Sequence, residues 1–90
     1  MSFKEKFDMV KKAKELQKKL RSETITVTAG AVRIVINGEQ KVQEVNIDRD
    51  LVDSENLEKL EREIKSALEQ AITKSQAIAA NIAKGMGIGF

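Results

Sequence analysis

The first 21 residues alternate between hydrophobic and polar positions with the period of a helix. No glycine or proline interrupts them, and good helix formers fill the remaining positions. The spacing predicts an amphipathic helix over residues 3–21. One hydrophobic stripe, with steps of four, three and four residues, consists of Met9, Ala13, Leu16 and Leu20. A second apolar flank beside the lysines consists of Phe3, Phe7 and Val10.

The hydrophobic period then shortens to two, which is typical of half-buried strands. This pattern predicts strands over residues 23–28, 31–36 and 39–47, which are rich in β-branched residues. Ala29-Gly30 indicates a tight turn between the first two strands. Asn37-Gly38 predicts a two-residue type I′ turn between the second and third, because both residues tolerate a positive φ. We therefore expect an antiparallel meander of three strands.

The third strand contains a break in its period. Val45 and Ile47 are in phase with each other, whereas Val42 is out of phase with both. One extra residue in a strand shifts the phase by one position, so the pattern predicts a β-bulge near Gln43-Glu44.

A second helical pattern predicts a helix over residues 54–84. Asp53 or Ser54 is expected to cap its start, and Gly85 is expected as the C′ residue beyond its end. Leu51 and Val52, in the polar connection before it, are expected to point inward. The hydrophobic positions of the helix recur at steps of three and four residues and include Leu57, Leu60, Ile64, Leu68, Ala71, Ile72, Ile78 and Ile82.

The length of the second helix has a consequence for assembly. It would extend for roughly 46 Å, more than a globule of 90 residues can cover. The pattern therefore favours packing against another chain, which also supplements the small core of so short a domain. We expect one domain over residues 1–90, of the α+β class, closed by a short Gly-rich tail over residues 85–90.

Composition narrows the classes of function. The chain has no cysteine, histidine, tryptophan, tyrosine or proline. Without histidine or cysteine it lacks the usual bases and nucleophiles at neutral pH, so we expect no enzyme, no cofactor and no small-molecule substrate. No secretory signal and no apolar run of about 20 residues is visible, so we expect a cytoplasmic protein without a membrane contact.

The net charge of +2 is distributed unevenly along the chain. Residues 1–22 hold eight basic and three acidic groups, whereas residues 39–69 hold five basic and ten acidic groups. Residues 70–90 hold two lysines and no acid. Such asymmetry predicts a basic end that meets a polyanion.

Several ordered motifs together resemble one known family. Residues 30–38 read Gly-Ala-Val-Arg-Ile-Val-Ile-Asn-Gly, and residues 42–48 read Val-Gln-Glu-Val-Asn-Ile-Asp. The acidic entry into the long helix at residues 51–57 and the Lys-Gly-Met-Gly at residues 84–87 also fit. In these features the chain resembles the YbaB/EbfC family of bacterial nucleoid-associated DNA-binding proteins. The resemblance implies a helix–three strands–helix protomer, a tweezer-like homodimer and binding to duplex DNA in the nucleoid.

The basic first helix is the candidate DNA surface, since lysines gain affinity for phosphates by releasing counterions. Its helical period places several lysines on one face, opposite the stripe of Met9 and Leu16. Arg21 and Gln17 are the only obvious readers of base edges there, which predicts weak sequence preference. The expected DNA-binding residues are Lys4, Lys11, Lys12, Lys14, Lys18, Lys19, Arg21, Lys74 and Lys84. The alternative is that these lysines are only solvated.

Two further interpretations remain open. The chain is either a DNA-binding homodimer or a coiled-coil protein-interaction module that binds no DNA. The acidic residues of the long helix are expected to form a solvated face with local Lys59–Glu63 and Lys65–Glu69 pairs, without a metal site. The glycines after residue 84 follow a helix instead of a strand and lack a P-loop Lys-Ser/Thr, so they predict no phosphate loop.

Overall fold

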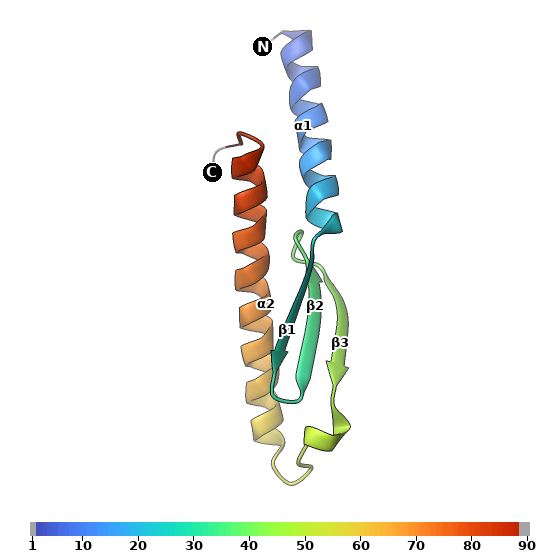
Figure 1. Cartoon of the computed structure of the whole chain (residues 1–90), viewed down its shortest axis with the longest axis vertical. Coiled ribbons are helices and arrows are strands. Elements are labelled where there is room, and N and C mark those ends of the chain that lie inside the picture. Colours follow the sequence, from blue (N-terminus) through green and yellow to red (C-terminus); the bar gives the residue numbers. More distant parts are fainter. Residues whose placement is uncertain (1, 89–90) are drawn as a thin grey trace.

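The computed structural model describes residues 2–88 and has the expected α+β architecture. A helix, three antiparallel strands and a long helix follow one another, with a short 3-10 turn before the last helix (Figure 1). The molecule is elongated, with extents of 64 × 19 × 17 Å. The elements are α1 (Phe3–Ser22), β1 (Thr24–Ala29), β2 (Val32–Asn37), β3 (Val42–Ile47), η1 (Arg49–Leu51) and α2 (Leu57–Gly85).

Helix α1 begins with a capping box and runs beyond the end of the sheet (Figure 1). The Ser2 hydroxyl accepts a hydrogen bond from the Glu5 amide, and the Glu5 carboxylate accepts one from the Ser2 amide. No residue of α1 is buried. The helix is therefore stabilised by its own caps and helix formers, with little packing against the rest of this chain.

The core lies between one face of the sheet and α2. Ile25 of β1 is opposite Ile36 of β2, and directly opposed residues of antiparallel strands share a face. Small residues of α2 let its backbone approach the strands, and the helix packs over β1 and β2. The buried cluster comprises Ile25, Val27, Val32, Ile34, Ile36, Ala67 and Ala71.

The predicted β-bulge is confirmed. Val35 is opposite Glu44, but the next residue of β2, Ile36, is opposite Val42. Gln43 is therefore the extra residue in β3. The third strand begins at Val42, three residues later than expected, because residues 38–41 form the connecting loop.

The turn between β1 and β2 consists of Gly30 and Ala31, one residue later than predicted. Gly30 has φ +56°, a left-handed conformation that favours glycine. The Ala31 amide donates a hydrogen bond of 3.1 Å to Oε2 of Glu63. Glu63 is half-buried in this contact, so the expectation that it belongs to a solvated face and pairs with Lys59 is wrong.

The prediction of a two-residue turn at Asn37-Gly38 is also wrong. The Asn37 amide donates to the Lys41 carbonyl, which closes a longer loop, and Gln40 takes the positive φ of 64°. The Asn37 side-chain oxygen accepts hydrogen bonds from the amides of Glu39 and Lys41. These side-chain bonds stabilise the longer loop against the shorter type I′ alternative.

Gly38 serves close packing instead of a left-handed turn. Its amide donates a hydrogen bond of 2.9 Å to the Leu20 carbonyl in the last turn of α1. A Cβ at this position would lie 2.8 Å from that oxygen. Gly38 therefore sets how closely the β2–β3 loop approaches the end of α1.

Both ends of α2 differ from the expectation. Asn56 caps the start by accepting from the Lys59 amide, whereas Asp53 caps a local turn at the Glu55 amide. Gly85 is the last helical residue, and Gly87 at φ +77° is the C′ residue. The Gly87 amide donates to Lys84 and the Ile88 amide to Ala83, which is a Schellman motif. Residues 89–90 of the expected tail lie outside the described residues.

Candidate nucleic-acid interface

Helix α1 presents a row of exposed lysines on one face. At 100° per residue, Lys4, Lys11, Lys14 and Lys18 fall within about 80° of one another. Each is exposed, and none forms an ion pair with any residue between 2 and 88. Lys12 and Lys19 lie to one side of this row and are exposed as well. The four lysines of the row are called the lysine face below.

Arg21 is held differently from the lysines. Its Nε donates a hydrogen bond of 2.8 Å to Oε1 of Glu39 in the β2–β3 loop. Gln17 approaches the other oxygen of the same carboxylate, with 3.5 Å between its Nε2 and Oε2. Glu39 therefore contacts both side chains that the sequence singles out as readers of base edges. Sequence reasoning missed Glu39, because only the closed loop brings it back to α1.

The two lysines of α2 lie apart from each other. Lys84 is in the last turn of α2, where its charge is favourable at the negative end of the helix dipole. Lys74, ten residues earlier, lines a shallow groove together with Glu69, Gln70 and Thr73. An acidic residue thus lies beside Lys74 in this groove, whereas Glu15 borders the lysine face of α1 without forming an ion pair with it.

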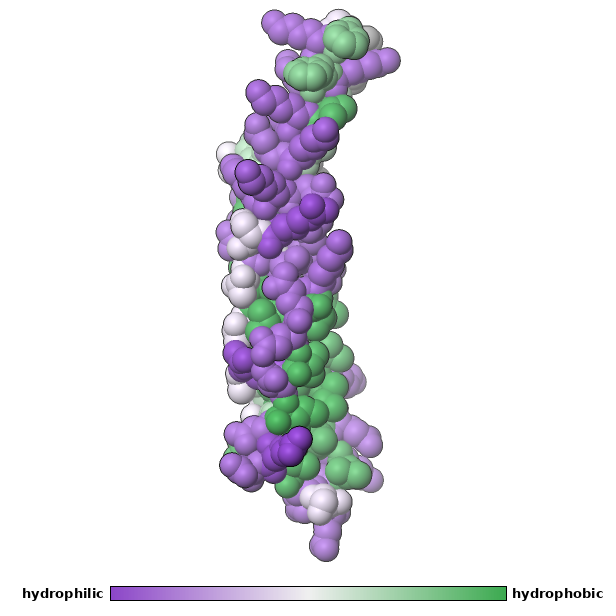
Figure 2. All heavy atoms as spheres, turned by 90° about the vertical axis from the view of Figure 1, so that its right-hand side faces the viewer, coloured by the Kyte–Doolittle hydropathy of each residue, from purple (hydrophilic) through white to green (hydrophobic). Residues whose placement is uncertain are grey.

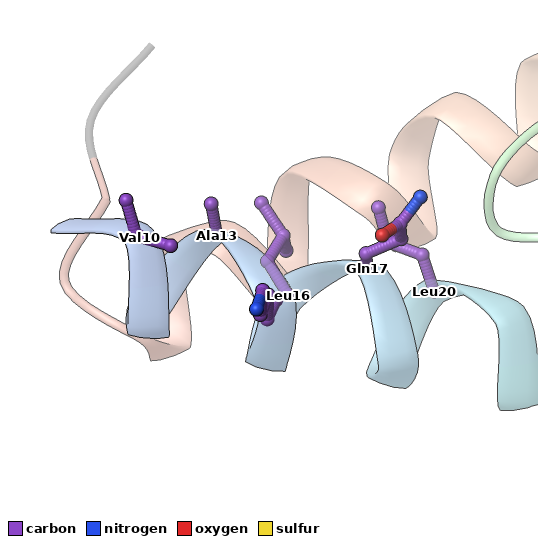
Figure 3. A pocket seen from close by; sticks show the side chains of 6 residues that line it. Val10, Ala13, Leu16, Gln17 and Leu20 are labelled. Atoms are coloured by element: carbon purple, nitrogen blue, oxygen red, sulfur yellow. The ribbon is translucent and has the colours of Figure 1, made fainter. Parts of the chain in front are cut away.

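A hydrophobic stripe of α1 remains uncovered by the described part of the chain. Val10, Ala13, Leu16, Gln17 and Leu20 line an open groove along the helix together with Lys14 of the lysine face, and the five labelled side chains point to one side of the helix (Figure 3). Ile88 contributes to a second groove beside Met9 and Leu16. Helix α1 makes few contacts with α2, so these hydrophobic side chains stay largely uncovered by the rest of the described chain.

A larger hydrophobic patch covers the β3 side of the molecule (Figure 2). Val45 and Ile47 are opposite the buried Ile34 and Val32, so they lie on the core face of the sheet. Helix α2 covers β1 and β2 but leaves these side chains 56% and 43% exposed. Leu51 is also exposed, so the expectation that it points inward is wrong, whereas Val52 is half-buried.

One flank of α2 adds hydrophobic residues to the same side. The buried Ser75 hydroxyl donates to the Asn37 carbonyl at the end of β2, so this flank of α2 turns toward β2 and β3. Leu68 and Ile72 lie seven and three residues before Ser75, on the same flank, and both are exposed. We call Val42, Val45, Ile47, Leu51, Leu68 and Ile72 the β3 patch.

Comparison with known proteins assigns the family. The model of the YbaB/EbfC DNA-binding family matches residues 2–90. The chain belongs to the YbaB/EbfC DNA-binding family. It is 37% identical over 83 residues to a nucleoid-associated protein of Syntrophobacter fumaroxidans, covering 86% of this chain and 76% of that one. A nucleoid-associated protein of Thermoanaerobacter pseudethanolicus is 33% identical, with 88% and 74% covered.

The YbaB/EbfC fold is also seen in a solved structure. An uncharacterized protein from Helicobacter pylori superposes with a TM-score of 0.77 over 96% of this chain and 97% of the other, at 23% identity. Within residues 2–88 of this YbaB/EbfC chain, no helix is long and apolar enough to cross a membrane. The same residues contain no group of three or more acidic side chains positioned to hold a metal ion.

Proposed function

We propose that this chain is a nucleoid-associated protein that binds duplex DNA with low sequence specificity through its lysine face. The single observation that supports this most strongly is the row of four exposed lysines without acidic partners, on a member of a DNA-binding family. Each lysine that contacts a phosphate gains affinity by releasing counterions, and phosphates are the same at every base pair, so these contacts do not read base sequence. The role is architectural and requires no catalysis, and it places the protein in the nucleoid, within the cytoplasm.

Low specificity follows from the residues that are available. Lysine acts as a point charge, whereas arginine and glutamine form the bidentate contacts that distinguish bases. Glu39 engages both Arg21 and Gln17 in the described structure. Phosphate contacts therefore dominate the proposed interface, with Lys12, Lys19, Lys74 and Lys84 as proposed secondary contacts and Arg21 as a further one that Glu39 weakens.

The proposal includes a homodimer that forms through the β3 patch. Single exposed hydrophobic residues are ordinary, but a contiguous patch marks an interaction site. In a two-fold dimer the same surface of both copies meets, so the apolar β3 patch of one copy would be buried against the apolar β3 patch of the other. A dimer doubles the number of lysine faces that meet one duplex, which raises the overall affinity.

The test is a salt series with a random-sequence duplex of about 30 base pairs. The slope of log affinity against log salt is about −0.9 for each phosphate neutralised. The triple variant Lys11→Glu, Lys14→Glu, Lys18→Glu is expected to abolish retention on DNA while its circular dichroism and molar mass stay unchanged. Undiminished binding by this variant would show that the lysine face is not the DNA surface.

A charge-matched control separates local contact from net charge. Lys41, Lys59 and Lys65 are exposed and lie outside α1. Changing these three to glutamate alters the net charge equally, and we expect it to reduce affinity far less. If the wild-type protein binds no duplex even at low salt, the protein-interaction module replaces this proposal.

A further inference from the structure

Two aromatic side chains near the start of α1 are largely exposed among residues 2–88. Phe3 and Phe7 are 86% and 61% exposed. They are separated by four residues, so they lie one above the other on the same side of the helix. Together the two rings form a small apolar surface at the end of the helix that is available to a partner.

The two rings share the side of α1 that carries the lysine face. Lys14 and Lys18 lie 11 residues after Phe3 and Phe7, close to three full turns of 3.6 residues. At 100° per residue, Phe7 points between Lys14 and Lys18 in projection along the helix axis. A surface that contacts the lysine face along its length therefore reaches the two rings at its end.

The rings lie far from the β3 patch. Figure 1 shows the start of α1 at one end of the molecule and η1 at the other. In Figure 2 a small hydrophobic cluster at the α1 end is separated from the larger patch by hydrophilic surface. Phe3 and Phe7 are therefore not part of the β3 patch.

We propose that Phe3 and Phe7 form an apolar wedge that inserts between adjacent base pairs of the duplex bound by the lysine face. This inference rests on the proposed function and adds the deformation that binding imposes on the DNA. The rings lie on the side of α1 that carries the lysine face, and the charge of that face fits a polyanion, whereas Lys4 and Lys6 next to the rings are balanced by Glu5 and Asp8. Apolar side chains placed between base steps unstack them and kink the duplex.

The wedge also determines which sequences are bound most easily. A phenylalanine ring makes no hydrogen bond to a base edge, so it reads no sequence directly. Pyrimidine–purine steps such as TA unstack more easily than others, so the wedge favours duplexes that contain them. Any preference of this protein therefore reflects deformability.

The experiment compares the wild-type protein with Phe3→Ala/Phe7→Ala on one duplex. The duplex carries 2-aminopurine beside a central TA step, and the fluorescence of 2-aminopurine rises when this base unstacks. A donor dye and an acceptor dye at the two ends of the duplex report its bending. Wild-type protein is expected to raise the fluorescence and shorten the end-to-end distance. The double variant is expected to lose both signals and to bind about tenfold more weakly at fixed salt.

The salt dependence distinguishes the wedge from the lysine face. Removal of the rings leaves the number of phosphate contacts unchanged, so the double variant keeps the slope of log affinity against log salt. Alanine favours a helix, so the double alanine variant is expected to keep α1 folded. The variant Phe3→Leu/Phe7→Leu retains two apolar side chains and is expected to restore most of the bending. Met9→Ala is the matched control, because Met9 is 57% exposed but lies on the opposite side of α1.

Each outcome decides the proposal. Loss of bending with an unchanged salt slope supports the wedge. Normal bending and fluorescence by the double alanine variant overturns it while leaving the DNA-binding function intact. If wild-type protein binds the duplex without any unstacking signal, the wedge is wrong although DNA binding stands. If wild-type protein does not bind, both proposals fail together.

Discussion

Arg21 and Glu39 are 18 residues apart in the chain, yet their side chains meet at 2.8 Å across the junction between α1 and the β2–β3 loop. The glutamate side chain is only 14% exposed, whereas the arginine is 57% exposed. The carboxylate thus forms part of the folded loop, while the guanidinium sits at the edge of the basic helix. This pair places an acidic group directly beside the surface that we propose for DNA.

Replacing Glu39 with glutamine is expected to strengthen DNA binding. The change removes one negative charge near the lysine face and releases Arg21 for a phosphate. One additional phosphate contact makes the slope of log affinity against log salt steeper by about 0.9. The measurement is a fluorescence anisotropy titration at several salt concentrations.

Glu44→Gln provides the control for that experiment. Glu44 pairs with Arg33 at 3.1 Å on the sheet, away from α1, so its loss changes the net charge equally. We expect no change of slope in this variant. Equal slopes for wild type and Glu39→Gln would mean that Glu39 does not keep Arg21 from a phosphate.

Val45→Asp is expected to prevent dimer formation. Val45 is 56% exposed in the described chain and lies at the centre of β3. A charged carboxylate in a buried apolar interface is strongly unfavourable, whereas in the isolated chain the same side chain points into solvent. Light scattering during size-exclusion chromatography measures the molar mass.

The control places the same charge on the other face of the sheet. Thr26 lies on β1, opposite Val35, on the face that α2 does not cover, and it is exposed. Thr26→Asp is expected to leave the molar mass unchanged. A Val45→Asp protein that remains dimeric would move the interface away from the β3 patch.

Gly30→Ala is expected to destabilise the fold by about 1–3 kcal/mol. The left-handed φ of +56° is unfavourable for alanine, and the added Cβ would lie 1.4 Å from Oε2 of Glu63. The Glu63 side chain must then move and release the Ala31 amide. Urea denaturation followed by circular dichroism gives the free energy of unfolding.

Gly85→Ala tests the same substitution where the structure predicts the opposite sign. Gly85 is the last helical residue, and nothing lies within 4 Å of a Cβ placed there. Alanine favours a helix over glycine by about 0.5–1 kcal/mol, so a small stabilisation is expected. Similar losses at both positions would argue against the specific role of the Gly30 turn.

The regular parts of the fold and the lysine face could be predicted from the sequence because they depend on periodicity alone. A helix period places Lys11, Lys14 and Lys18 on one face, whatever the rest of the chain does. The bulge at Gln43 could likewise be counted from the phase of Val42 and Val45. Both predictions require only local geometry.

The positions that were misjudged depend on contacts between distant residues. Gly38 lies against the Leu20 carbonyl, so tertiary packing and the Asn37 side chain overrode the local preference for a type I′ turn. The contact of Glu39 with Arg21 exists only once that loop has closed. Asn56 is the N-cap of α2 instead of Asp53 or Ser54, and the sequence pattern does not distinguish among these three suitable residues.

The bulge in β3 also bears on how far copies of this protein assemble. β3 is an edge strand, and unpaired edges can add further strands without limit, which leads to fibres. The extra residue Gln43 interrupts the regular ladder and twists this edge away from a flat template. At the β3 edge, the bulge therefore disfavours open-ended addition of strands and is compatible with the closed, face-to-face dimer that we propose.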